Sequence, residues 1–122
     1  MKRRFRLAKS SDFKRVRRLG KSYAHPLIVL IALPNGLDTS RFAVAAGRGI
    51  GKAVERNYAK RRMREGIRSL LPSIQPGWDI LLLARKPISE ASFQQIEAAL
   101  QALFRRAQLL NRTDGERNLH GT

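Results

Sequence analysis

The chain has 122 residues, 43% of them hydrophobic, a formal net charge of +16 and a pI of about 11.7. This length suits one domain with its own core, and so strong a positive charge predicts a polyanionic partner, nucleic acid before an anionic membrane. Cysteine is absent, which excludes disulfides, thiolate metal sites and a cysteine nucleophile.

The N-terminal segment is strongly basic, with ten Lys or Arg and a single acid among residues 1–21. No apolar stretch of signal-peptide length follows Met1, and the longest apolar run, residues 26–34, is far too short to span a bilayer. We therefore expect a soluble cytoplasmic protein without a membrane partner, whose residues 1–9 form a flexible basic arm.

A short helix is expected next, with Ser10 or Ser11 as its N-cap and Gly20 at its end. Phe13 and Val16, three residues apart, would face inward, although Phe13 has about even odds of stacking on a nucleobase instead. The basic residues of this helix would face outward: Lys14, Arg15, Arg17 and Arg18.

Three apolar segments are predicted to be strands. Residues 27–33 form a continuous apolar run rich in β-branched residues, which is typical of a buried central strand. After a turn at residues 34–36, residues 41–47 are expected to form a second strand, antiparallel to the first. Residues 78–84 are again nearly all apolar and are predicted to be the third strand.

The segment between the second and third strands is predicted to be a helix that ends near Leu71, before Pro72. Residues 47–68 hold eight Lys or Arg and only two acids. At 100° per residue the apolar side chains fall on one side: Ala59, Met63, Ile67, Leu70 and Leu71. A neighbouring row, about three turns or roughly 15–17 Å long, consists of Asn57, Lys60, Arg61, Arg64 and Arg68.

This row of cations favours nucleic acid over the alternative of a solvated helix face. Solvated faces usually mix charges for pairing between successive turns, whereas only Glu55 and Glu65 could pair here. Arginine offers a planar fork to phosphate oxygens and lysine a point charge. Upstream, the spacing of Gly47, Gly49 and Gly51 fits neither nucleotide-binding glycine motif and indicates a loop with unusual dihedrals.

The last helix is expected to be capped by Ser89 or by Ser92, which has capping-box spacing to Gln95. Residues 111–122 are polar and are expected to be a flexible tail. The element order helix, strand, strand, helix, strand, helix predicts an α+β fold, a small sandwich with one central sheet and helices largely on one face. We expect residues 1–122 to form a single RNA-binding domain.

No catalytic centre and no metal site can be assigned from the sequence. His25 and His120 have no carboxylate near them in the sequence, and the nine acids are scattered. Nothing in the spacing of Asp38 and Asp79 suggests that they meet at a metal ion. The residues therefore offer binding chemistry, and we assign no catalytic and no metal-ligating side chain.

One stretch of the predicted central helix resembles the signature of the bacterial ribonuclease P protein component. It reads Arg56-Asn57-x-x-Lys60-Arg61-x-x-Arg64-Glu65 and is preceded by Gly51-Lys52-Ala53-Val54. Supporting similarities lie at residues 11–22, 33–36, 40–41, 76–79 and 84–87, so the resemblance covers about residues 5–107.

The resemblance implies a function. The ribonuclease P ribonucleoprotein is an endoribonuclease that removes the 5′ leader from precursor tRNA with Mg²⁺, which the RNA subunit mainly binds. The RNA subunit cleaves, while the protein binds that catalytic RNA and the leader and needs no protein partner. It also implies a mixed sheet with a left-handed βαβ crossover and possibly one extra short strand.

The resemblance also implies site residues. Six residues match positions that in the family lie against the catalytic RNA: Lys52, Arg56, Asn57, Lys60, Arg61 and Arg64. Arg48 before the helix and Arg68 at the end of the row of cations are expected to contact the same RNA, and the residues expected to contact the leader are Phe13, Arg17 and Ile31. Arg17 and Ile31 stand where the family often has aromatic residues, and Arg48-Gly49 replaces a common pair of lysines. Leader binding would then depend more on charge and aliphatic packing than on stacking.

Two other readings remain. A ribosomal or other structural RNA-binding protein has the same composition, and only the signature argues against it. A protein-only nuclease or a DNA-binding protein is disfavoured, because no catalytic constellation and no helix-turn-helix pattern is present.

Overall fold

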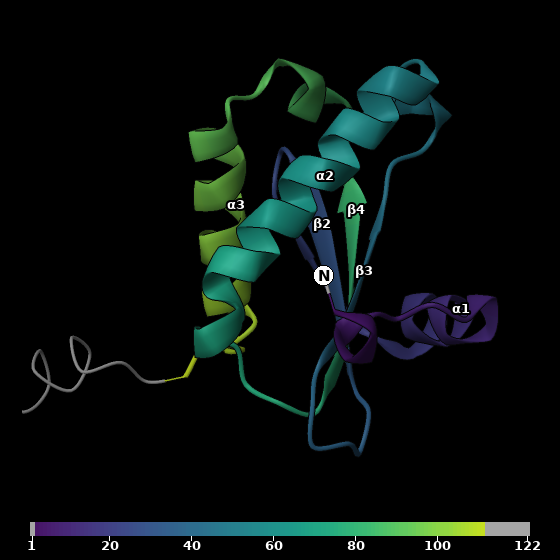
Figure 1. The fold of residues 1–122 in the computed structure, drawn as a ribbon, viewed down its shortest axis with the longest axis vertical. Helices are drawn as coiled ribbons and strands as arrows, with labels where there is room; N and C mark the ends of the chain where they lie inside the picture. The colour runs from purple at the N-terminus through teal and green to yellow at the C-terminus, as the bar shows by residue number, and fades with distance from the viewer. Residues whose placement is uncertain (1, 112–122) are drawn as a thin grey trace, which may run out of the picture.

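The computed structural model describes residues 2–111 and shows a twisted four-stranded sheet with helices on both faces (Figure 1). The helices are α1 (Ser10–Leu19), α2 (Ala53–Leu70) and α3 (Phe93–Arg106), and the strands are β1 (Lys21–Ala24), β2 (Ile28–Pro34), β3 (Arg41–Ala45) and β4 (Trp78–Ala84). Helices α2 and α3 cover one face of the sheet, and α1 lies on the other. This confirms the predicted α+β class.

The strand order is β1-β2-β4-β3, so the last strand in the sequence lies inside the sheet. Strand β4 is antiparallel to β2 and parallel to β3. Strands β2 and β3 therefore run in opposite directions, as predicted, but β4 lies between them and they do not pair with each other. The connection β3–α2–β4 is the βαβ crossover that the resemblance implies, and its left-handedness stays a prediction.

Strand β1 is the extra short strand that the resemblance implied. It pairs antiparallel with β2, with Lys21 opposite Ala32 and Ala24 opposite Val29. The apolar pattern did not reveal it because β1 is an edge strand with only Tyr23 partly buried. Backbone pairing with β2, rather than burial of its own side chains, holds this segment in place.

The central strands are apolar on both faces because both faces are covered. In β2 and β4, Ile28 and Leu82 point into the core beneath α2 and α3, whereas Ile31 and Leu81 pack against Val16 of α1. Burial on both sides explains the continuous apolar runs in the sequence.

Helices α2 and α3 approach each other closely at Gly66. This residue is buried, and a Cβ atom placed on it would collide with Cδ1 of Leu100 on α3. Glycine therefore sets the distance between the two helices, which fixes the position of α2 on the sheet.

The predicted N-caps of α1 and α3 had different outcomes. Helix α1 starts at Ser10 with Lys9 at the N-cap position, so the prediction of a Ser10 or Ser11 cap was wrong. The Ser92 cap is confirmed: the Gln95 N–H donates to Ser92 Oγ at 3.1 Å, and the Ser92 N–H donates to Gln95 Oε1 at 2.8 Å.

The arm expected to be flexible has defined contacts in the structure from Lys2 onward. Arg6 forms a parallel bridge to Phe42 of β3, the Leu7 N–H donates to the Phe42 carbonyl at 2.8 Å, and the Leu7 side chain is buried. An apolar side chain that fits beside α1 is the physical reason for this difference. The expected tail lies outside the described residues apart from Asn111. Within residues 2–111, no helix has the length and apolarity needed to cross a membrane.

Candidate nucleic-acid interface

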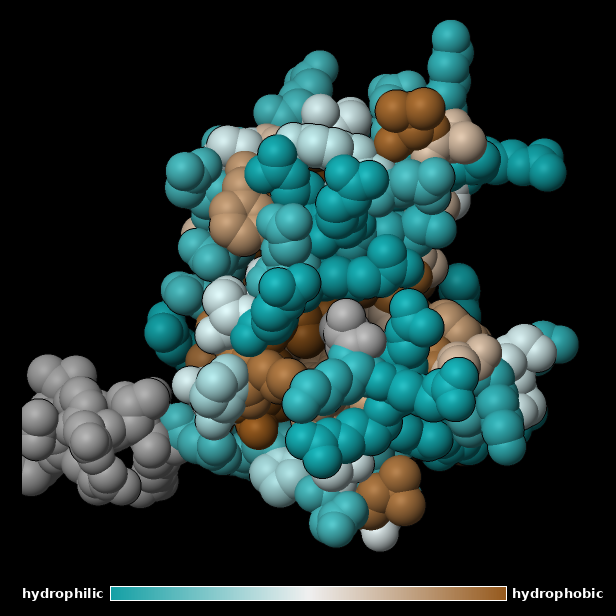
Figure 2. Space-filling view, in the orientation of Figure 1, coloured by the Kyte–Doolittle hydropathy of each residue, from teal (hydrophilic) through white to brown (hydrophobic). Residues whose placement is uncertain are grey.

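The predicted row of polar residues on α2 lies on the surface, next to the buried stripe. Ala59, Met63 and Ile67 are buried against the sheet and α3, as predicted. Asn57, Arg61, Arg64 and Arg68 are exposed, and Arg56 and Lys60 are partly exposed. Hydrophilic side chains cover the ridge of α2 in Figure 2.

The row has no internal counterions in the described part of the chain. Every ion pair found there within 4 Å involves Arg15 or Arg41, and none involves a cation of α2. Cations that stay unpaired on one helix face repel each other, so an external anion would stabilise this surface.

The loop before α2 is shaped by Gly51 and Glu55. Gly51 has φ +141°, which side-chain-bearing residues rarely adopt, and a Cβ there would meet the Glu55 carboxylate at 2.7 Å. The Lys52 N–H donates to Glu55 Oε1 at 3.1 Å, so one of the two acids of this segment is used to cap the helix. Lys52 and Arg48 are both exposed beside this helix start.

Arg62 is a cation of α2 that lies outside the row. Its guanidinium carbon lies 4.5 Å from the centre of the Tyr58 ring and 5.5 Å from that of Phe93 on α3. These cation–π contacts direct Arg62 toward α3 and away from the row.

A hollow of about 200 Å³ separates α2 from α1, and it is lined by Arg6, Leu7, Ala8, Phe13, Phe42, Ala43, Val44 and Arg64. We call it the Phe13 hollow. It brings the partly exposed Phe13 of α1 and the cationic Arg64 of α2 to one depression. The sequence predicted both residues, but not that they line the same space.

The other two residues expected at the leader differ from each other. Arg17 is exposed on α1 and is free to meet a phosphate. Ile31 is only 6% exposed, because it packs beneath α1 with Val16 and Leu81. The expectation of direct leader contact by Ile31 is therefore corrected: this side chain supports α1 from below.

A buried carboxylate, which the sequence did not single out, ties α1 to the sheet. Asp79 on β4 accepts hydrogen bonds from Arg15 Nη2 at 2.6 Å, Arg41 Nη2 at 2.7 Å, Arg41 Nε at 2.9 Å and Asn35 Nδ2 at 3.0 Å. The prediction that Arg15 faces outward was wrong, because its guanidinium turns to Asp79. Asp12 contacts the same Arg15 at 3.3 Å.

The surroundings of Asp79 determine its protonation. Burial by itself raises the pKa of the Asp79 carboxyl, but the hydrogen bonds from Arg41, Asn35 and Arg15 outweigh burial, so this pKa lies below its ordinary value. The hydrogen bond to Asp79 in turn raises the pKa of Arg41. Both groups are therefore charged at neutral pH and act as a structural ion cluster.

The described acidic side chains do not form a cluster of metal ligands. Within residues 2–111, no three His, Asp or Glu side chains come together as metal ligands. Asp79 is surrounded by guanidinium and amide donors, and Asp38 lies in a different hollow.

A small α+β fold that presents an unpaired row of cations beside a hollow with an accessible aromatic ring defines a basic nucleic-acid-binding protein. Comparisons with known proteins show which family within this class the chain resembles. A family profile described as Ribonuclease P matches residues 1–108. The ribonuclease P protein component of Roseiflexus sp. (strain RS-1) is 40% identical over 115 residues, covering 93% of this chain and 94% of that protein.

Solved structures agree with the sequence comparison. The RNase P protein of Staphylococcus aureus has a TM-score of 0.81 at 30% identity, with 88% of this chain and 98% of that chain covered. The RNase P protein of Thermotoga maritima has a TM-score of 0.76 at 34% identity, with 83% and 96% covered. The chain belongs to the ribonuclease P protein family, and the role in processing tRNA 5′ ends follows from that family.

Proposed function

We propose that the row on α2 binds the catalytic RNA subunit of ribonuclease P, and that the Phe13 hollow binds the 5′ leader of precursor tRNA. The observation that carries this proposal is the row itself, four cations and an amide without counterions among residues 2–111. Arg48, Lys52 and Arg56 extend the same basic surface to the start of the helix.

The chemistry of the row matches an RNA backbone. Successive side chains on one face recur about every 6 Å along a helix axis, a spacing comparable to that of phosphates along a strand. Arginine can bind two phosphate oxygens at once, and Asn57 adds a neutral donor and acceptor. Contacts of this kind position RNA without reading its sequence.

The Phe13 hollow suits a single strand rather than a duplex. A partly exposed aromatic ring can stack on an unpaired base, and Arg64 and Arg17 can hold the phosphates on either side. Ile31 contributes by supporting α1 from below. Such binding tolerates many leader sequences, because every base has a face that stacks.

We assign the catalytic centre to the RNA subunit, with Mg²⁺ bound mainly by RNA. The two carboxylates that lie close together, Asp12 and Asp79, support this assignment, since both are paired with arginines. The protein would contribute positive charge where RNA strands approach each other, which lowers their repulsion. The role in tRNA maturation also supports the expected cytoplasmic location.

The test is cleavage of a precursor tRNA with a 5′ extension at low Mg²⁺. The reaction is run with the protein alone, with bacterial ribonuclease P RNA alone, and with both. We expect cleavage only with both, or a strong enhancement over RNA alone. Cleavage by the protein alone would move the catalytic centre into this chain, and tight RNA binding without enhancement would favour a structural RNA-binding protein.

A further inference from the structure

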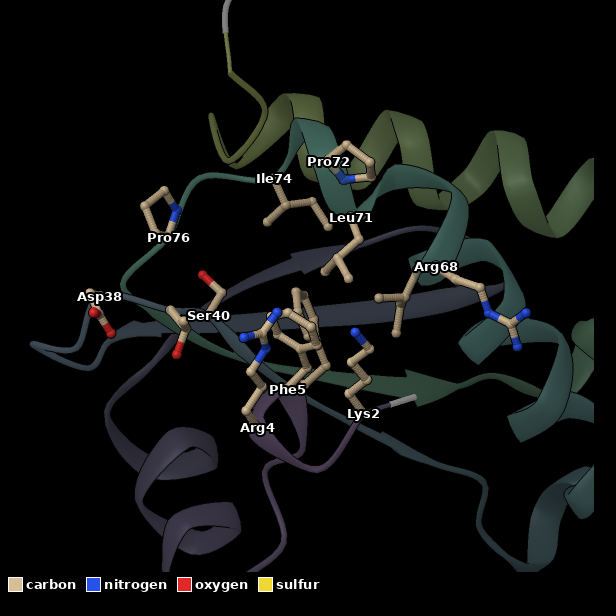
Figure 3. A pocket seen from close by; sticks show the side chains of 13 residues that line it. Lys2, Arg4, Phe5, Asp38, Ser40, Arg68, Leu71, Pro72, Ile74 and Pro76 are labelled. Carbon is tan, nitrogen blue, oxygen red and sulfur yellow. The ribbon is translucent and has the colours of Figure 1, made fainter.

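A second, larger hollow lies at the far end of α2. Its volume is about 630 Å³, and it is enclosed by the N-terminal turn Arg3–Phe5, the end of α2 and the segments around Asp38 and Ile74 (Figure 3). The walls are apolar: Phe5, Phe42, Ile67, Leu71, Pro72, Ile74 and Pro76. The charged residues that line it are Lys2, Arg4, Arg68 and Asp38. We call it the Phe5 hollow.

We propose that the Phe5 hollow takes one unpaired nucleobase of an RNA strand whose phosphates lie on the adjoining cations. This inference rests on the proposed function and extends it to a second site. The Arg4 guanidinium lies over the Phe5 ring, 4.8 Å from its centre, and Phe5 is partly exposed. Unpaired bases in RNA–protein complexes stack on such aromatic rings and guanidinium planes.

The charges around the hollow give the bound nucleotide a direction. Lys2 and Arg68 lie toward one end and Asp38 toward the other, with Phe5 between them (Figure 3). Phosphates therefore belong at the end with Arg68, since a carboxylate repels them. The Asp38 carboxylate accepts hydrogen bonds only, so it favours a base that carries an amino group.

The hollow is continuous with the row on α2, and this favours RNA over an apolar peptide. Arg64 lines the Phe13 hollow and Arg68 lines the Phe5 hollow, one helical turn or about 6 Å further on. Phe42 contributes to both hollows. Three cations against one carboxylate also match a polyanion better than a neutral apolar ligand.

The first experiment detects the base directly. The protein is labelled with ¹³C at Ile, Leu and Val methyl groups and titrated with a single-stranded RNA pentamer, then with the same pentamer carrying an abasic central nucleotide. We expect upfield ring-current shifts of the Leu71 and Ile74 methyl signals with the intact pentamer, and no such shifts with the abasic pentamer. The Val44 methyl signals report binding in the Phe13 hollow separately. Equal shifts with both pentamers, or none at Leu71 and Ile74, would refute base insertion.

The second experiment compares Arg4→Ala with Arg3→Ala. Both residues are exposed arginines of the same turn, and both changes remove one charge, but only Arg4 lines the hollow. We expect Arg4→Ala to weaken RNA binding at least about threefold more than Arg3→Ala. Affinities of both variants are measured for ribonuclease P RNA and for precursor tRNA with and without its leader. The RNA for which Arg4→Ala costs more affinity than Arg3→Ala is the one that supplies the base. Equal losses on all three RNAs would overturn the proposal.

A third variant separates this inference from the proposed function. Arg61→Ala changes the row on α2 and does not touch the Phe5 hollow. If Arg61→Ala weakens RNA binding while Arg4→Ala equals Arg3→Ala, only the inference about the Phe5 hollow fails. If Arg61→Ala also leaves binding unchanged, the proposed function of the row fails.

Discussion

Asp79 connects three parts of the fold through one carboxylate. Its partners come from α1 (Arg15), from β3 (Arg41) and from the turn after β2 (Asn35), so the cluster fixes α1 against the sheet. Because α1 carries Phe13, the buried acid also fixes one wall of the Phe13 hollow. The sequence could not reveal this: four basic residues of α1 are of similar type, and only the packing of α1 on the sheet decides which one reaches Asp79.

Asp79→Asn is expected to destabilise the protein by roughly 3 kcal/mol at pH 7, since two guanidiniums lose their buried counterion. The folded-state pKa of Asp79 is depressed, so its stabilisation is fully present above the unfolded pKa of about 3.9 and is lost as pH falls through the lower folded value. Urea unfolding of both forms should therefore differ at pH 7 and converge in strong acid. The exposed Asp38 provides the control Asp38→Asn. If both changes lowered the free energy of unfolding equally, the ion cluster around Asp79 would not be what stabilises the fold.

Phe13→Ala is expected to reduce leader affinity more than stability, because part of the Phe13 ring is exposed in its hollow. Val16→Ala is the matched change on the same helix: Val16 is fully buried, and its truncation should lower the melting temperature instead. Binding of a precursor tRNA with and without its leader, measured beside thermal unfolding, checks both. If Phe13→Ala instead lowered the melting temperature strongly and left leader binding intact, the role of Phe13 would be core packing and not leader binding.

The sequence predicted the positions of the helices and strands well, but it did not predict which strands are neighbours in the sheet. Residues 78–84 form β4 with the predicted bounds, and α2 ends one residue before the predicted Leu71. Both carry a clear apolar pattern. The position of β4 between β2 and β3 depends on contacts between distant segments, which no local pattern encodes, and β1 is held by pairing rather than by burial of its side chains.

The row on α2 leads to a prediction about salt. Arg61→Ala is expected to weaken binding to ribonuclease P RNA and to lower the slope of log affinity against log salt by about one unit, the share of one phosphate contact. Arg105→Ala on α3 removes the same charge from an exposed helix position outside the row and should leave the slope nearly unchanged. If both variants lower the slope equally, net charge rather than the row determines binding.

The contact between α2 and α3 also leads to a prediction. Gly66→Ala should destabilise the protein by about 1–3 kcal/mol, because the added methyl group must displace the buried Leu100. The cost should be much smaller when Leu100 is already alanine, so a double-mutant cycle by urea unfolding measures the contact. Additive effects of the two changes would mean that Gly66 matters for another reason.

For the molecule as a whole, the charge of +16 works against folding even as it favours RNA. Asp12 and Asp79 are already paired with Arg15 and Arg41, so these acids do not neutralise the other cations of the described surface. A partner that neutralises them stabilises the folded chain by mass action.

Salt should therefore act on stability and on binding in opposite directions. Between low salt and about 0.3 M sodium chloride, the melting temperature of the free protein should rise as self-repulsion is screened, while RNA affinity falls. The buried Asp79 cluster is screened less and should not reverse the trend. Differential scanning calorimetry of the free protein checks this, and a falling melting temperature would show that attractive ion pairs dominate.

The position of β4 in the sheet has a consequence during synthesis on the ribosome. Strands β2 and β3 do not pair with each other, and both pair with β4, which is not complete until Ala84 has been added. A nascent chain from which α2 has emerged but β4 has not exposes the cations of α2 and lacks the strand that would bury the apolar side of α2. The molecule must therefore emerge almost whole before it folds, in a compartment crowded with the polyanions that its surface attracts.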